Sequence, residues 1–149
     1  MKKWMKKVLI IIGMLVMLGG IGIRIWLSKE STVKKIVIKY EQELNEYAEM
    51  RLTSGTKEEK KWFSWDIRLG RGEVPSVCFS VYYKWENDKG FYYSKTGEPL
   101  GFMGETENLE PDKSGAGWIW EQAKEEKSGH DVYYTEKIVG NWYWYDMQW

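Results

Sequence analysis

The chain has little of the chemistry that builds most cross-links, metal sites and catalytic centres. Its 149 residues include one cysteine, one histidine and three prolines. A single cysteine excludes an internal disulfide, so the folded part relies on packing alone. A single histidine leaves no second imidazole for the usual zinc sites. A glycine-rich phosphate loop, a nucleophile elbow and an internal repeat are also missing, so the sequence has none of the common nucleotide-binding or hydrolase signatures.

The two residues that could still carry chemistry have simpler explanations. Cys78 lies in VCFSV, where we expect a small side chain in a strand, and no neighbour in sequence is a base that would activate a thiolate. His130 stands beside Asp131 in an expected turn, but adjacent residues rarely aim at a common point. We therefore predict no catalytic residue, no metal and no cofactor. An enzyme of unknown class ranks third among the functional hypotheses.

The charge of the chain is divided unevenly, although its sum is zero. Basic and acidic residues each number 22. Residues 1–27 contain no acid and hold five of the basic residues, which are Lys2, Lys3, Lys6, Lys7 and Arg24. Residues 28–149 therefore keep 17 basic residues against 22 acidic ones, a net charge of −5. We expect no nucleic-acid partner, because affinity for nucleic acid comes largely from neutralising phosphates with Lys and Arg.

Residues 8–27 have the length and composition of a membrane-spanning helix. Sixteen consecutive residues from position 8 carry neither a charge nor a polar side chain, and Arg24 can reach its head outward near the far end. A helix of this length crosses a hydrocarbon core of ~30 Å at ~1.5 Å per residue. Trp4 and Trp26 bracket the span, where interfacial aromatic residues lie. The lysines before the span place the N-terminus in the cytoplasm and residues 28–149 outside, so the lipid bilayer is the first expected partner.

A cleaved signal peptide begins in the same way, with a basic region followed by an apolar run. No alanine occurs before Ala48, so the preferred small-residue cleavage pattern is missing, although Gly20 and Gly22 are weak substitutes. No cysteine directly follows the span, which excludes a lipid-modified cysteine. We expect an uncleaved anchor, and cleavage stays open as the alternative.

After the anchor, the hydrophobic pattern has first a helical period and then a strand period. Apolar residues recur at three- and four-residue steps over 36–52, which predicts an amphipathic helix. Ser31 or Thr32 can cap its start and Gly55 can end it, while the β-branched stretch 34–40 could open as a strand instead. The helix is expected to cover the sheet face that carries Phe63, Trp65, Val81 and Tyr145.

A period of two predicts antiparallel strands over residues 62–69 and 77–85. Residues 87–90 are expected to turn the chain into another strand, and Pro99 marks a return strand as a sheet edge. Residues 117–127 form a strand or a short helix, and the cluster of Trp and Ile at their start favours the strand. The sequence thus predicts an α+β domain over 28–149, with one helix on a mainly antiparallel meander of about five to seven strands.

Residues 131–149 predict a β-hairpin. Two strand-like segments, 131–139 and 142–149, flank the two-residue loop Gly140-Asn141, which favours a primed turn. When Val139 is paired with Trp142 and the register is extended outward, the core face collects Tyr143, Tyr145, Met147 and Trp149. The opposite face carries Trp142, Trp144 and Lys137. We predict these three residues as candidate partner contacts, provided that their face is uncovered.

The whole layout resembles the membrane-anchored immunity proteins of the TipC type, which bacteria place outside the membrane against incoming toxins. The shared features are a lysine-rich start, one span, a compact acidic α+β domain and the stretch EVPSVCFSVYY at 73–83. The resemblance implies a protein partner, a toxin that is bound and blocked at the cell surface, and it transfers no functional residue. The second hypothesis is a cell-envelope accessory domain that binds a cell-wall component, glycan or peptide, through exposed rings.

Overall fold

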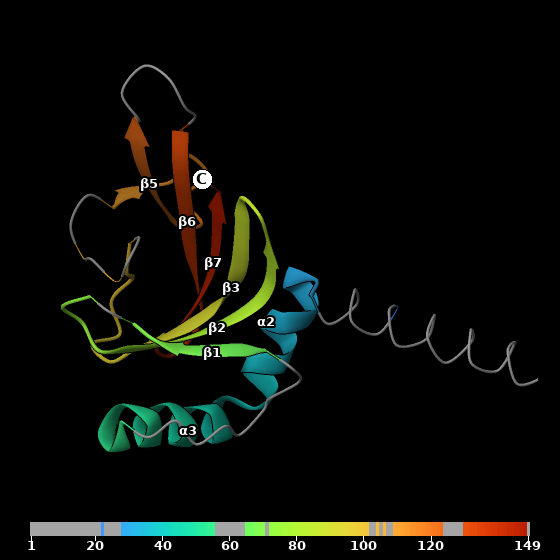
Figure 1. Ribbon diagram of the computed structural model, residues 1–149, viewed down its shortest axis with the longest axis vertical. Helices are drawn as coiled ribbons and strands as arrows, with labels where there is room; N and C mark the ends of the chain where they lie inside the picture. The colour runs from blue at the N-terminus through green and yellow to red at the C-terminus, as the bar shows by residue number, and fades with distance from the viewer. Residues whose placement is uncertain are drawn as a thin grey trace, which may run out of the picture.

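The computed structural model describes residues 28–55, 65–70, 72–101, 109–123 and 130–148, together with Gly22, Gly104 and Thr106. Within these residues the fold is α+β, with two helices and a seven-stranded antiparallel sheet (Figure 1). No helix in this described part is long and apolar enough to cross a membrane. The expected span, with Trp4 and Trp26, lies outside the described residues apart from Gly22.

The predicted helix is two helices, α2 (Glu30–Lys39) and α3 (Glu41–Ser54), separated at Tyr40. The β-branched stretch is helical because tertiary burial overrides its strand propensity. Val33 and Val37, four residues apart on one face of α2, are completely buried. α2 starts after Lys29 with no side-chain cap, so the predicted caps at its start are wrong. Gly55 ends α3 as predicted, in the left-handed conformation that glycine adopts at low cost.

The sheet consists of two runs of neighbouring strands that meet in the middle. Its order is β1-β2-β3-β7-β6-β5-β4, so β3 lies beside β7 and the sheet is not one continuous meander. The strands are β1 (Asp66–Leu69), β2 (Ser76–Lys84), β3 (Asn87–Ser94), β4 (Glu110–Pro111), β5 (Trp118–Ala123), β6 (His130–Val139) and β7 (Trp142–Gln148). The preferred strand at 117–127 is therefore confirmed as β5. Figure 1 shows a strong twist, with β1 running nearly across β6.

Side chains are buried on both faces of this sheet. On one face, α2 packs against β6 and β7, and α3 packs against β2. The buried cluster between them includes Leu44, Trp65, Phe79, Phe91, Trp142 and Trp144. The other face has a second cluster, which includes Tyr92, Leu100, Trp120, Tyr133, Tyr143 and Tyr145. The chain between β3 and β5 contributes Leu100 and Leu109 to this second cluster, so the face without helices is also covered in part.

The register of the C-terminal hairpin differs from the predicted one by a single residue. Val139 pairs with Trp142 as predicted, but the register then shifts, and Lys137 pairs with Tyr143. The residue left over is Ile138, at a β-bulge, where two residues of one strand oppose one of the other. Every pair beyond it is offset, so that Glu136 instead of Lys137 lies opposite Trp144.

The β2–β3 connection also differs from the predicted one. Lys84 pairs with Asn87, so the turn consists of Trp85 and Glu86 rather than residues 87–90. A second bulge at Val81 shifts the register of β2 between Ser80 and Tyr82. The predicted return strand through Pro99 is wrong, because residues 98–101 are not part of any strand.

Candidate functional site

The two tryptophans predicted as partner contacts lie in the core. Trp142 is 0% exposed and Trp144 is 1% exposed, beneath the helices rather than on an open face. The indole Nε1 of Trp142 donates a hydrogen bond of 2.7 Å to Asn45 Oδ1 on α3. A buried indole N–H needs such an acceptor, and the helix provides it. The condition for a contact surface, an uncovered face, is not met, and both rings are explained by packing.

Lys137 is separated from both tryptophans. It is exposed on the face opposite the helices, and its Nζ lies 5.7 Å from the centroid of the Tyr143 ring. The bulge at Ile138 causes this separation, because it pairs Lys137 with Tyr143 instead of Trp144. The three predicted contact residues therefore do not form one surface. Trp4 and Trp26, the predicted interfacial residues, lie outside the described part of the chain.

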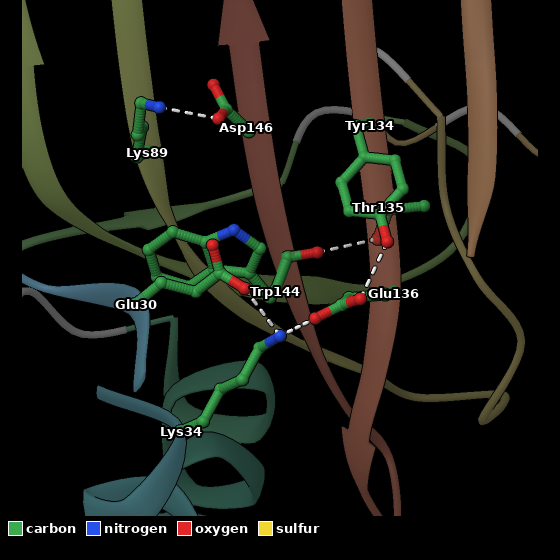
Figure 2. A network of polar contacts seen from close by, with 8 residues as sticks. All are labelled: Glu30, Lys34, Lys89, Tyr134, Thr135, Glu136, Trp144 and Asp146. Carbon is green, nitrogen blue, oxygen red and sulfur yellow. Dashed lines mark hydrogen bonds and ion pairs between the residues drawn. The ribbon is translucent and has the colours of Figure 1, made fainter. Parts of the chain in front are cut away.

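A charged network ties the start of α2 to the sheet (Figure 2). Lys34 Nζ contacts Glu30 Oε1 at 2.7 Å on its own helix and also Glu136 on β6. The other carboxylate oxygen of Glu136 accepts a hydrogen bond of 2.6 Å from the Tyr134 hydroxyl. Two carboxylates share one ammonium here and each has a defined partner. The network fixes the position of α2 on β6.

The opposite face of the sheet holds a buried polar cluster around Asp88. Its carboxylate is 3% exposed and accepts hydrogen bonds from Ser80 Oγ at 2.6 Å and from the Tyr145 hydroxyl at 3.2 Å. Arg68 Nη2 lies 3.4 Å from the second carboxylate oxygen. A buried carboxylate is costly unless it is paired and hydrogen-bonded, and this one has three partners. The cluster is a satisfied structural network.

Cys78 lies next to this cluster and is held as a thiol. Burial raises its pKa to about 11, and the nearby Arg68 guanidinium offsets only part of that rise. Only the thiolate is a strong nucleophile, so this side chain is inert at neutral pH. Burial likewise raises the pKa of the Tyr145 phenol well above its usual value, and the Asp88 carboxylate adds to the effect. Both groups therefore stay protonated at neutral pH. Within the described residues, no three His, Cys, Asp or Glu side chains are grouped to hold a metal ion.

The exposed rings of the domain gather at the β2–β3 turn. We call Tyr82, Tyr83 and Trp85 the aromatic tip; they are 39%, 63% and 87% exposed. Trp85 has φ +45°, a left-handed conformation that bulky residues rarely adopt. Lys84 and Glu86, on either side of Trp85, are exposed as well. The aromatic run YYKWE in the sequence is the signal for this surface. The predicted strand over 77–85 has no bulge, so its alternation puts Tyr83 and Trp85 on the same face as the core residues Val77 and Phe79.

The chain was compared with protein-family models, curated proteins and solved structures, and none of the three comparisons found a match. The functional argument therefore rests on the sequence and on the geometry described above.

Proposed function

We propose that the chain is a membrane-anchored binding module, with residues 8–27 in the bilayer, the N-terminus in the cytoplasm and the α+β domain outside the membrane. The basic, acid-free leader and its long apolar run support the anchor and its orientation. The absence of internal disulfides is compatible with an exported domain whose two buried clusters provide the packing.

The observation that carries a binding role, rather than catalysis, is the division between buried and exposed side chains. Two reactive side chains among the described residues are not available for chemistry: the buried Asp88 carboxylate has three partners, and the half-buried Cys78 thiol has a raised pKa. The rings of Tyr83 and Trp85, by contrast, are exposed on a short, paired turn. Exposed large rings are typical of interaction surfaces.

The proposed partner is a protein, and its class, a toxin met at the cell surface, follows from the resemblance in layout to TipC-type immunity proteins. The net charge of −5 over residues 28–149 fits a partner with a basic surface, because complementary charge speeds association and disfavours wrong partners.

A pull-down with residues 29–149 as bait tests this proposal against secreted proteins and wall material from the same cells. We expect recovery of a secreted protein. Recovery of wall glycan alone, with no secreted protein, would refute it. A Tyr83→Ser/Trp85→Ser double variant serves as the matched bait. It is expected to keep the fold, because both rings are exposed. If this bait no longer recovers the protein, the contact lies at the aromatic tip.

The topology is tested separately by protease treatment of intact protoplasts. We expect the domain to be digested while the cytoplasmic contents stay protected. A domain that stays uncut in intact protoplasts, but is cut after lysis, would overturn the proposed orientation.

The second candidate function is an envelope accessory domain that binds glycan. Tyr83 and Trp85 favour it as a specific observation, because an exposed ring face can stack on a sugar. Recovery of glycan by the unchanged bait, and its loss with the double variant, would support this function over the immunity role.

A further inference from the structure

The aromatic tip lies at one particular end of the domain, which can be identified from the course of α2. Near its start, Lys34 contacts Glu136, which pairs with Trp144 in the middle of β7. Just after its end, the Glu41 carboxylate lies where a Cβ on Gly140 would be, at the β6–β7 turn. α2 therefore runs toward the β6–β7 turn, and its start points to the opposite end of the sheet.

The opposite end of the sheet is where β2 and β3 turn. Trp144 pairs with Phe91 on β3, and the strand continues from there through Lys89 to Asn87, next to the turn. Figure 1 shows the same arrangement, with the start of α2 on the side of the β2–β3 turn. The aromatic tip and the point where the leader joins the domain are thus at the same end.

The link between the apolar span and α2 and the β2–β3 hairpin extend about equally far beyond the start of α2. α2 begins at Glu30, and the apolar span ends at residue 27, so the linking residues cover at most about 10 Å when extended. α2 rises about 6 Å from Glu30 to Lys34, and β3 covers about 7 Å from Lys89 to Phe91, so α2 begins near the level of Lys89. The β2–β3 hairpin extends past this level by two strand residues and the turn, which is also about 10 Å. The tip therefore reaches about as far toward the membrane as the end of the span does.

We propose that the aromatic tip rests in the outer interface of the same membrane that the leader spans, as a second contact that orients the domain. The inference depends on the proposed anchor. Tyr and Trp concentrate at the membrane–water interface, where the ring is shielded and its polar atom stays hydrated. Such an environment also accounts for a tryptophan that is 87% exposed on an ordered turn.

The charge of the tip indicates what kind of lipid contact this is. Lys84 and Glu86 flank Trp85 and their charges cancel. The contact therefore comes from the rings and does not require anionic lipid. It also directs the opposite end of the domain, with the β6–β7 turn and the chain around Glu98, away from the membrane.

The test uses the full chain in lipid vesicles with a fluorophore whose emission reports polarity. The fluorophore is attached to a W85C variant and, as the matched control, to an E98C variant. Glu98 is exposed and lies at the far end, since its neighbour Gly97 accepts a hydrogen bond of 2.5 Å from Tyr143 and adjoins Asn141 of the β6–β7 turn. The native Cys78 can remain, because its half-buried thiol has a raised pKa and reacts slowly.

In phosphatidylcholine vesicles that carry a nitroxide near the headgroup, we expect the W85C label to emit at shorter wavelength and to lose fluorescence, while the E98C label does neither. Equal behaviour of the two labels would overturn the proposal. So would a response of the W85C label that occurs only in anionic vesicles, or only after wall glycan or a partner protein is added. Flotation of the same vesicles reports the anchor independently: protein that floats without quenching refutes the tip contact alone, and protein that fails to float refutes the anchor and the tip contact together.

Discussion

Replacing Trp144 with alanine is the most direct test of how the sheet is covered. Trp144 is 1% exposed beneath the helices and lies between Phe91 on β3 and Glu136 on β6. Its main-chain carbonyl accepts a hydrogen bond of 2.9 Å from Thr135 Oγ1, which the substitution leaves in place. The change therefore removes the indole ring and little else, and it leaves a cavity in the largest buried cluster.

Truncation of a buried Trp to Ala costs about 3–5 kcal/mol of unfolding free energy, through lost transfer energy and the cavity left behind. A domain of this size has about 5–15 kcal/mol in total, so about a fifth or more of its stability is at risk. With a urea m-value of about 2 kcal/mol/M, the midpoint of unfolding should fall by about 2 M.

The assay is urea unfolding of residues 29–149 followed by far-UV circular dichroism. Trp85→Ala is the matched control, because it is the same chemical change at a ring that is 87% exposed. We expect it to change the free energy of unfolding by less than about 0.5 kcal/mol. Equal losses for the two variants, or a larger loss for Trp85→Ala, would refute the assignment of Trp144 to the core and of Trp85 to the surface.

Three further predictions concern hydrogen bonding and titration. Asn45→Ala should lower the free energy of unfolding by about 1–3 kcal/mol in the same urea assay, because it leaves the Trp142 indole N–H buried without its acceptor; no loss would contradict that bond. Cys78 should react with a maleimide at pH 8 only slowly in the folded domain and fast in urea, because its pKa is raised to about 11, and fast labelling without urea would contradict the raised pKa. The domain should also lose stability as the pH rises above ~10, where phenols ionise in the unfolded chain but stay protonated in the folded one. An unchanged urea midpoint between pH 9 and pH 11 would contradict the raised pKa values, which burial gives to Tyr92, Tyr133 and Tyr145.

Segments of alternating polar and apolar residues predicted three of the seven strands closely. The segments 77–85, 131–139 and 142–149 correspond to β2, β6 and β7 within one residue at each end. These strands could be predicted because two-residue alternation over eight or nine residues fits no helix. Helix α3 was predictable for the same kind of reason, and Gly55 marked its end.

The break between the helices and the meeting of β3 with β7 could not be predicted. Tyr40 is neither Gly nor Pro, and the three- and four-residue period of apolar side chains runs through it without interruption. The contact of β3 with β7 joins residues 49 to 61 positions apart, from Tyr93–Trp142 to Asn87–Gln148, and no pattern within one strand encodes such contacts. Leu100 and Leu109, in the chain between β3 and β5, cover part of the second face of the sheet, and no periodic pattern in the sequence marks them for that role.

The errors about candidate contact residues have one physical origin, which is the pair of bulges at Val81 and Ile138. A strand alternates faces, so one extra residue moves every residue beyond it to the other face. In β6 the bulge brings Val132 and Tyr134 onto the face of the two buried tryptophans.

In the predicted hairpin, which has no bulge, Val132 and Tyr134 lie on the face of Tyr143 and Tyr145, and this face is then the more apolar of the two. In β2 the bulge at Val81 interrupts the alternation that, in the predicted strand, puts Tyr83 and Trp85 on the core face. Val81 and Ile138 are ordinary β-branched strand residues, so nothing in the sequence marks them. The bulges become visible only in the pairing of the assembled sheet, where they bend the strand and increase its local twist. The prediction therefore put Trp142 and Trp144 on the surface and Tyr83 and Trp85 in the core, whereas the structure has the reverse. The surface at the β2–β3 turn could be recognised only from the register of the folded sheet.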